Sequence, residues 1–182
     1  MKKMLINILI VVVIAVAALA AFIASRPSDF TITRTATMSA PPSTVFAQVD
    51  DFHKWTAWSP WENIDPALKR EYSGPDGGTG AHYHWAGNRS VGEGQMTIAE
   101  SKPGELIRIK LEFLRPFKAT NDTAFSFAPQ GNGTLVTWTM KGKNNFMMKA
   151  MGLMMNMDKV LGGQFEQGLA AMKTASEGAG KT

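Results

Sequence analysis

The order in which strand-like and helix-like patterns follow one another constrains the fold of this chain more than any other feature. Apolar and polar residues alternate in short segments that are separated mostly by glycine-containing turns, as in an antiparallel meander. The predicted strands are Phe30–Met38, Ala67–Ser73, Ala81–Ala86, Val91–Glu100, Glu105–Phe113, Ala119–Ala128 and Thr134–Lys141. Residues 144–175 lack proline and repeat apolar residues at three- and four-residue steps, which predicts one long helix.

These elements predict an α+β domain in which a curved antiparallel sheet wraps around the C-terminal helix. Two short helical turns, around Val45 and Phe52, are expected between the first and second strands. A sheet that curls around a single helix leaves space between the two layers, and this space is the natural place for a ligand.

An apolar run precedes the domain. From Met4 to Ala24 the only polar residue is Asn7. About 21 residues at roughly 1.5 Å per residue span about 30 Å, the thickness of a hydrocarbon core, so the run predicts one transmembrane helix. Lys2 and Lys3 favour an N-terminus in the cytoplasm, with the domain on the extracytoplasmic side of the cell (inner) membrane. Arg26 and Arg34 weaken this charge asymmetry.

A cleaved signal peptide is the competing interpretation of the same run. Ala18-Leu19-Ala20 has the small-residue pattern of a cleavage site. Apolar residues continue beyond it through Phe22 and Ile23, however, and the run is longer than a usual signal core. The predicted division is an anchor over residues 1–26, a domain over 27–176 and a disordered tail over 177–182.

Charge and composition exclude several classes of function. The chain carries 19 basic and 15 acidic residues, but without Lys2, Lys3 and Arg26 the balance is 16 to 15. The domain therefore lacks the basic footprint of a nucleic-acid-binding protein. There is no cysteine, which excludes disulfides, thiolate metal sites and a cysteine nucleophile. No dinucleotide or phosphate-loop motif occurs, so no cofactor is expected.

Two segments are rich in large apolar side chains. The first, here called the tryptophan loop, is residues 55–61, which hold three of the five tryptophans beside Pro60. Proline rules out a regular helix or central strand here, so the rings cover the core, a ligand or a membrane surface. The second, the methionine segment, is residues 146–158 and contains six methionines. Methionine is flexible and suits either an adaptable core or a pocket for variable apolar ligands.

The arrangement resembles the SRPBCC superfamily of START-like helix-grip proteins, in particular its polyketide cyclase/dehydrase and lipid transport branch. The resemblance covers about residues 30–175. Its motifs are SAPPSTVFAQVDDFHKWTAWSPW from Ser39, YSGP from Tyr72, YHWAGN from Tyr83, VGEGQMTI from Val91, LEFLRPF from Leu111 and TLVTWTMKG from Thr134. Members similar to this chain often carry one N-terminal membrane helix. The superfamily places many functions on one cavity, so the resemblance implies the fold more strongly than the reaction.

The expected function is the binding of a hydrophobic small molecule or lipid between the sheet and the C-terminal helix. The expected cavity wall is Ile109, Leu111, Phe113, Phe125, Phe127, Trp138, Met151, Met154 and Met155, with Trp58, Trp61, Tyr83 and Trp85 near the mouth. Two alternatives remain open. One is a cyclase- or dehydrase-like enzyme with Glu93, His84 or Asp158 as the acid–base group. The other is an interaction module whose core is filled.

A metal site is not expected. His82 and His84 share one face of a strand, but no third ligand is obvious nearby, and zinc sites need three or four. Strand alternation would instead place the two histidines towards solvent and Tyr83 and Trp85 towards the core.

Overall fold

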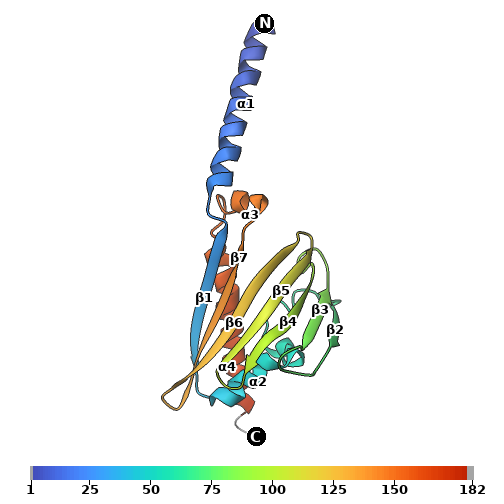
Figure 1. Ribbon diagram of the computed structural model, residues 1–182, viewed down its shortest axis with the longest axis vertical. Helices are drawn as coiled ribbons and strands as arrows, with labels where there is room; N and C mark the ends of the chain where they lie inside the picture. The colour runs from blue at the N-terminus through green and yellow to red at the C-terminus, as the bar shows by residue number, and fades with distance from the viewer. Residues whose placement is uncertain (1, 180–182) are drawn as a thin grey trace.

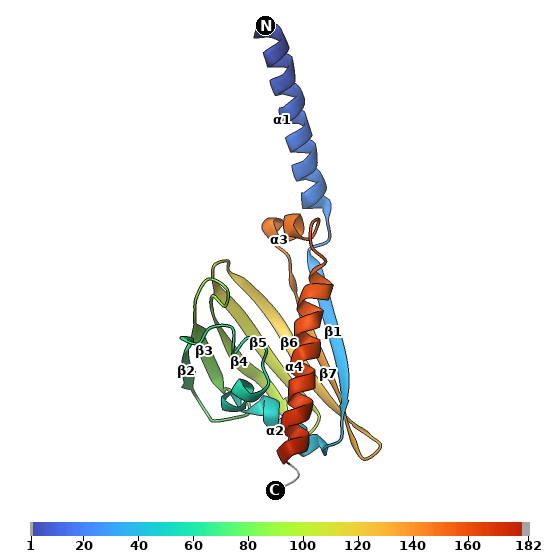
Figure 2. The same ribbon diagram turned by 180° about the vertical axis from the view of Figure 1, so that it is seen from behind.

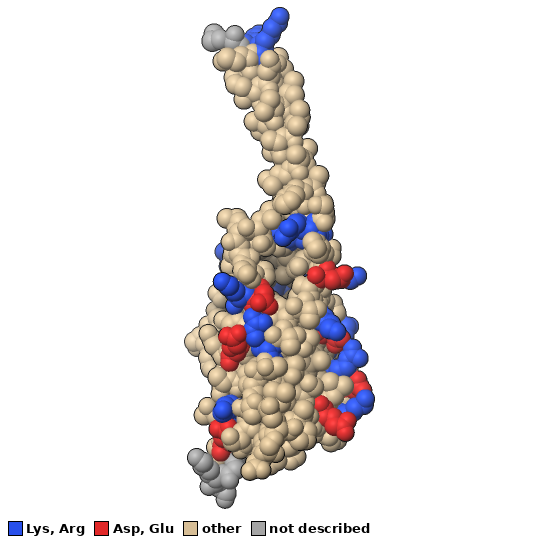
Figure 3. All heavy atoms as spheres, turned by 90° about the vertical axis from the view of Figure 1, so that its left-hand side faces the viewer, with Lys and Arg blue, Asp and Glu red and all other residues tan. Residues whose placement is uncertain are grey.

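The computed structural model describes residues 2–179 and consists of a domain with one helix projecting from it (Figures 1 and 2). This helix, α1 (Lys2–Ser25), is almost entirely exposed, and only Ile23 is buried. It is long and apolar enough to cross a membrane, a test that a signal sequence also passes. Figure 3 shows that α1 carries no charged side chain between the blue groups at its tip and at its base.

Seven strands form a single antiparallel sheet, which confirms the predicted meander. The strands are β1 (Asp29–Met38), β2 (Lys69–Ser73), β3 (His82–Ala86), β4 (Glu93–Lys102), β5 (Leu106–Arg115), β6 (Ala119–Gln130) and β7 (Gly133–Lys143). Their order is β1-β7-β6-β5-β4-β3-β2, so the first strand closes the sheet by pairing with the last. The sheet is curved, and α4 (Met157–Ala179) crosses its concave side over β1 and β7 (Figure 2).

Two short helices lie between β1 and β2, as expected. They are α2 (Pro42–Asp50) and the 3-10 helix η1 (Phe52–Ala57). Val45, Phe46 and Val49 of α2 are buried, and α2 packs against both β6 and α4. This end of the concave face is therefore filled by the protein's own side chains.

The C-terminal region is not the single helix that the sequence predicts. It divides into α3 (Phe146–Met151) and α4, separated by a turn over residues 152–156. Asn145 Oδ1 accepts a hydrogen bond from the Met148 amide at 2.9 Å, and Asn156 Oδ1 accepts one from the Lys159 amide at 3.1 Å. Two asparagines that cap helix N-termini eleven residues apart thus start two helices where apolar periodicity alone suggests one.

The predicted disordered tail begins too early. Helix α4 continues to Ala179, and Glu177 Oε1 accepts a hydrogen bond from the Ser39 amide at 2.7 Å. Residues 177–179 are therefore helical, and residues 180–182 lie outside the described residues.

One arginine links helix α4 to the first strand. Arg34 donates hydrogen bonds to Glu166 at 2.7 Å and to Asp158 at 3.0 Å. Gly162 makes room for it, because a Cβ there would lie 1.9 Å from Arg34 Nη2. These contacts fix the start of α4 over the edge of the sheet, beside the opening of the cavity described next.

Candidate functional site

A cavity of about 280 Å³ lies between the concave face of the sheet, the tryptophan loop and the start of α4. Its wall is mainly apolar and comes from nearly every layer of the domain. Phe30, Met140 and Lys143 contribute from β1 and β7, Leu111 and Phe113 from β5, and Met148, Met157 and Leu161 from the C-terminal helices. Helix α2 packs against β6 and α4 at the other end of the concave face, and none of its side chains lines this cavity.

The three rings of the tryptophan loop differ in burial, and both Trp55 and Trp61 line the cavity while Trp58 does not. Trp55 and Trp58 are 3% and 2% exposed, and their indole N–H groups donate to the Val49 and Gln48 carbonyls at 3.0 and 2.9 Å. Trp61 is only half-buried, lines the cavity, and meets the ring of Trp138 edge-on. Pro60 reverses the chain between Trp58 and Trp61, which sends the two rings to different places.

Trp138 forms the floor of the cavity. Its ring is stacked between Phe165 of α4, at a centroid distance of 4.0 Å, and Phe125 of β6, at 4.7 Å. Trp58 packs edge-on against Trp138 as well. Aromatic pairs at these separations add stability beyond the area that they bury, so the floor is rigid.

The structure places the predicted cavity residues in three groups. Those in the wall are Trp61, Tyr83, Trp85, Leu111, Phe113 and Trp138. Those in the core outside it are Trp58, Ile109, Phe125 and Phe127. Those on the surface are Met151, Met154 and Met155, which are 43, 91 and 46% exposed.

The second and third groups correct the predicted wall. Phe127 meets Phe46 of α2, and Phe125 meets Trp55 and Trp58, so side chains of the α2 region fill the part of the concave face that alternation alone would leave open. The three methionines miss the cavity because the break between α3 and α4 carries them past the end of the sheet. Met148 and Met157, on either side of that break, line the cavity instead.

A charged cluster is built into one side of the wall. Glu62 is 5% exposed and accepts a hydrogen bond from the Tyr83 hydroxyl at 2.7 Å and one from Arg70 Nε at 2.6 Å. Burial, together with the hydrogen bond to Glu62, raises the pKa of Tyr83 above its usual value, so its hydroxyl remains a donor. Glu62 and Arg70 were missed by sequence reasoning. Glu62 follows the tryptophan loop outside every predicted element, and Arg70 lies in a predicted strand whose alternation does not show that it pairs with Glu62.

Two buried polar atoms in the cavity wall have no hydrogen-bond partner within residues 2–179. They are Thr123 Oγ1 of β6 and Trp138 Nε1 of β7. Both residues are almost fully buried, at 3% and 1% exposure, and Asn121 beside them has only a weak contact to the sulfur of Met140. Unpaired buried polar groups are rare, and both of these belong to residues that line the cavity. Strand alternation in β6 could have indicated Asn121 and Thr123, because both share the face of Phe125.

None of the predicted acid–base residues reaches the cavity. His84 Nε2 lies 3.3 Å from Glu93 Oε1 on the outer face of the sheet, and Glu93 also pairs with Arg115. Asp158 is bound to Arg34, which lowers the pKa of its carboxyl. Among the residues that the structure describes, no group of three or more His, Asp or Glu side chains could hold a metal ion.

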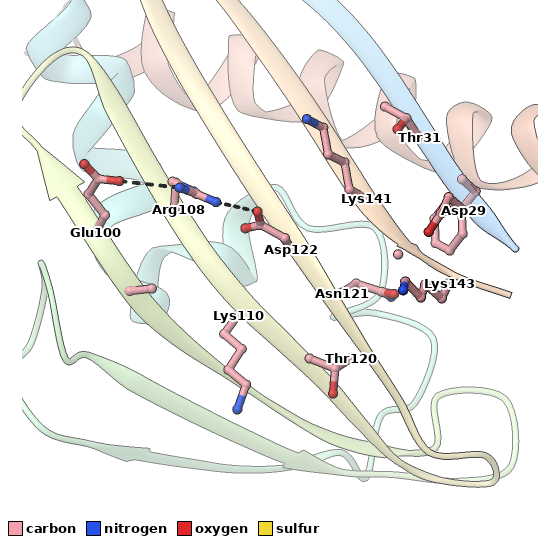
Figure 4. A pocket seen from close by; sticks show the side chains of 13 residues that line it. Asp29, Thr31, Glu100, Arg108, Lys110, Thr120, Asn121, Asp122, Lys141 and Lys143 are labelled. Atoms are coloured by element: carbon pink, nitrogen blue, oxygen red, sulfur yellow. Dashed lines mark hydrogen bonds and ion pairs between the residues drawn. The ribbon is translucent and has the colours of Figure 1, made fainter. Parts of the chain in front are cut away.

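A second hollow, of about 880 Å³, lies on the outer face of the sheet (Figure 4). Arg108 of β5 stands there between Asp122 of β6, at 2.6 Å, and Glu100 of β4, at 4.0 Å. Arg108 and Asp122 are each nearly half exposed, so the hollow is a shallow, solvated surface whose charges pair with one another. It is more open to solvent than the inner cavity.

Comparison with known proteins identifies the family of this domain. The model of the family described as "Polyketide cyclase / dehydrase and lipid transport" matches residues 29–177. The chain belongs to this family. The resemblance seen in the sequence is thereby confirmed. No curated protein sequence matches the chain.

Solved structures of the family's fold are similar over most of the chain. A Staphylococcus aureus protein of unknown function, SA2116, has a TM-score of 0.64 at 10% identity, over 86% of this chain and 99% of its own. A Chromobacterium violaceum protein, CV1439, has a TM-score of 0.60 at 18% identity, over 81% and 96%. The di-domain ARO/CYC protein BexL of the BE-7585A biosynthetic pathway has a TM-score of 0.61 at 15% identity, over 85% of this chain and 52% of BexL. At such identities the likeness extends to the fold alone.

Proposed function

We propose that this member of the polyketide cyclase/dehydrase and lipid transport family is a membrane-anchored binding protein for a hydrophobic small molecule or single-chain lipid. The observation that carries the proposal is the inner cavity, which is apolar apart from a few polar groups. Ligand pockets typically have this character and measure roughly 300–1,000 Å³, so a cavity of about 280 Å³ suits an occupant at the small end of that range.

The polar groups of the cavity specify one feature of the ligand. An indole N–H can only donate, so a partner for Trp138 Nε1 must be an acceptor such as a carbonyl, carboxyl or hydroxyl oxygen. The hydroxyl of Thr123 can donate to the same oxygen or accept from it. The proposed ligand is therefore an apolar molecule with an oxygen function that reaches the floor of the cavity.

The anchor is α1, with the domain on the extracytoplasmic side of the cell membrane. Its length, its lack of charge between Lys3 and Arg26, and the dilysine before it support this topology. The domain then stays beside the bilayer, from which a hydrophobic ligand could be drawn.

Native mass spectrometry of the full chain in detergent micelles, followed by organic extraction, tests the binding function. A cavity-filling variant, Ala119→Trp, has a matched control in Thr120→Trp, because Ala119 lines the cavity while its neighbour Thr120 is exposed on the outer face. We expect a bound hydrophobe with the native chain and with Thr120→Trp, and its loss with Ala119→Trp. Equal occupancy in both variants, or no bound hydrophobe in the native chain, would contradict the proposal.

A further inference from the structure

Exposed large apolar side chains outside α1 are concentrated in one short stretch. Within residues 2–179, the two that lie elsewhere are Ile64 and Phe117. The stretch contributes Phe146, Met147, Met151, Leu153, Met154, Met155 and Val160, and Met154 is 91% exposed. Soluble surfaces rarely gather so many apolar groups, and such a patch marks an interaction site.

This patch lies at the base of α1. Figures 1 and 2 show α3 between the end of α1 and the start of α4. Helices α1 and α3 are in contact, and Lys149 Nζ donates a hydrogen bond to the Ala24 carbonyl, in the last turn of α1, at 3.1 Å. If α1 spans the bilayer, its last turn lies at the membrane surface, and the patch lies at the same depth.

The charges around the patch suit a bilayer with anionic lipids. Lys143, Lys149 and Lys159 lie in or beside it, and Arg26 follows α1 directly. Of the acidic residues there, Asp158 is bound to Arg34, and Asp29 lies opposite Lys143 in the pairing of β1 with β7. Basic side chains beside an exposed apolar surface are the usual features of a segment that lies in the membrane interface.

The patch is also continuous with the cavity. Met148 and Met157, which flank the exposed residues from Met151 to Met155 in sequence, line the inner cavity. Phe30 and Lys143, from the ends of β1 and β7 nearest α1, line it as well. The stretch from α3 to the start of α4 thus has one side in the cavity wall and the other on the surface.

We propose that residues 146–155 insert into the interfacial layer of the membrane that holds α1, which places one end of the cavity against the bilayer. The inference rests on the anchoring role assigned to α1 above. Methionine side chains adapt to a disordered apolar surface, and interfacial segments insert about 5–10 Å. A ligand that leaves the cavity between Met148 and Met157 then enters lipid rather than water.

The test is a measurement of insertion depth in the full chain. The chain has no cysteine, so Met154→Cys takes one environment-sensitive NBD label without further changes. The protein is reconstituted in vesicles of phosphatidylcholine and phosphatidylglycerol, with or without bromines on the acyl chains near the headgroup. Asn132→Cys is the control, because Asn132 is exposed in the β6–β7 turn, at the opposite end of β7 from α3.

We expect brominated lipids to quench roughly half or more of the NBD fluorescence at position 154, and little of it at position 132, given an insertion of about 5–10 Å. Equal quenching at both positions overturns the inference. A label at 154 that is shielded in a concentration-dependent manner, but not quenched by bromolipids, also overturns it and indicates a second copy of the chain as the partner.

Two readings on the same vesicles separate this inference from the proposed function. Resistance to alkaline carbonate extraction reports whether α1 is an integral anchor, and organic extraction of the washed protein reports whether the cavity holds a hydrophobe. If the chain is anchored and loaded but position 154 is not quenched, the interfacial insertion fails alone. If carbonate releases the chain, the anchor fails and the insertion fails with it.

Discussion

The tryptophan loop and the methionine segment are both rich in large apolar side chains, yet one is mostly buried and the other mostly exposed. Trp55 and Trp58 are almost fully buried, with both indole N–H groups bonded to the α2 backbone. Met151 and Met154 are exposed at the base of α1. Composition therefore predicts that a segment needs an apolar partner, but not whether the partner is the core of the domain or something outside it.

The difference follows from the way each segment is joined to the sheet. Short 3-10 structure in η1 and the turn at Pro60 hold the tryptophans directly over β6 and β7. The methionine segment instead follows the end of β7, and α3 and its turn extend past the last pair of strands. One segment is thus enclosed by the sheet, while the exposed side of the other lies next to the end of α1.

The largest expected contrast is between alanine substitutions in the two segments. Trp58→Ala removes a ring that is packed against Trp138 and Phe125, and we expect it to lower the free energy of unfolding by about 3–5 kcal/mol. Met154→Ala removes an exposed side chain, and we expect a change within about 0.5 kcal/mol. Chemical denaturation of the full chain in micelles, followed by tryptophan fluorescence, gives both values.

A small effect of Trp58→Ala would show that the tryptophan loop is loosely held. A large effect of Met154→Ala would show that the methionine segment packs within the domain. Either result would remove the contrast on which the interfacial role of residues 146–155 depends.

Much of the fold could be predicted because β-strands and glycine turns are local patterns. All seven strands begin and end within two residues of their predicted bounds. The break between α3 and α4 could not be predicted from apolar periodicity, which runs through it. Asn145 and Asn156 cause the break, and an asparagine in a helical pattern is recognisable as a cap only when its amide partner is known.

The cavity was harder to predict than the fold. Alternation correctly assigns Leu111, Phe125 and Phe127 to the inner face, but it does not say which part of that face α2 covers. The Glu62–Arg70 pair depends on how the loop between the two residues folds, and the unpaired Thr123 hydroxyl depends on the lack of a partner elsewhere in the described residues. Alternation and periodicity in the sequence predict neither the ion pair nor the unpaired hydroxyl.

Adding one methyl group at each of two glycines tests the same difference between the packed core and the exposed methionine segment. A Cβ at Gly168 of α4 would lie 2.9 Å from the Trp138 ring and 3.1 Å from Pro60. The Trp138 ring cannot move away to make room, because it is stacked within the floor of the cavity. We expect Gly168→Ala to cost about 1–3 kcal/mol. Gly152, in the methionine segment, has helical backbone angles and ordinary contacts at 3.4 Å, so Gly152→Ala should be neutral or stabilise by up to about 1 kcal/mol.

Thermal unfolding of the two glycine variants beside the native chain checks this pair. Gly163→Ala is a further control within α4, because a Cβ at that position would meet nothing within 4 Å outside the adjoining turns of its own helix. If Gly168→Ala were as well tolerated as Gly163→Ala, the floor of the cavity would be softer than its stacking suggests.

The Tyr83–Glu62 contact predicts a pH dependence. The pKa of Tyr83 is raised in the folded protein above an unfolded value of about 10, so its contribution to stability is complete below about pH 10 and is lost as the pH rises further. One such proton changes the free energy of unfolding by about 1.4 kcal/mol per pH unit. We expect Tyr83→Phe to reduce the alkaline slope by up to this amount, measured by denaturation between pH 8 and 11.

The pKa of Tyr72, which stacks on Tyr83, is also raised, mainly by burial, and its contribution remains in the Tyr83→Phe protein. The variant should therefore keep some alkaline sensitivity. An unchanged slope would mean that Tyr83 already ionises in the folded state, and that Glu62 does not hold its proton.

The smallest expected effect on stability comes from the hydroxyl that the cavity leaves unpaired. Thr134 Oγ1 donates to the Ala40 carbonyl at 2.7 Å in a fully buried position, so Thr134→Val should cost about 1–3 kcal/mol. Thr123 Oγ1 has no partner within residues 2–179, so Thr123→Val should change the stability of the ligand-free chain by less than about 0.5 kcal/mol or even increase it.

The same variant should weaken retention of an oxygen-bearing hydrophobe, measured as occupancy by native mass spectrometry. A threonine that matters for the ligand but not for the fold would be a binding residue, whereas equal costs at positions 123 and 134 would make Thr123 an ordinary part of the core.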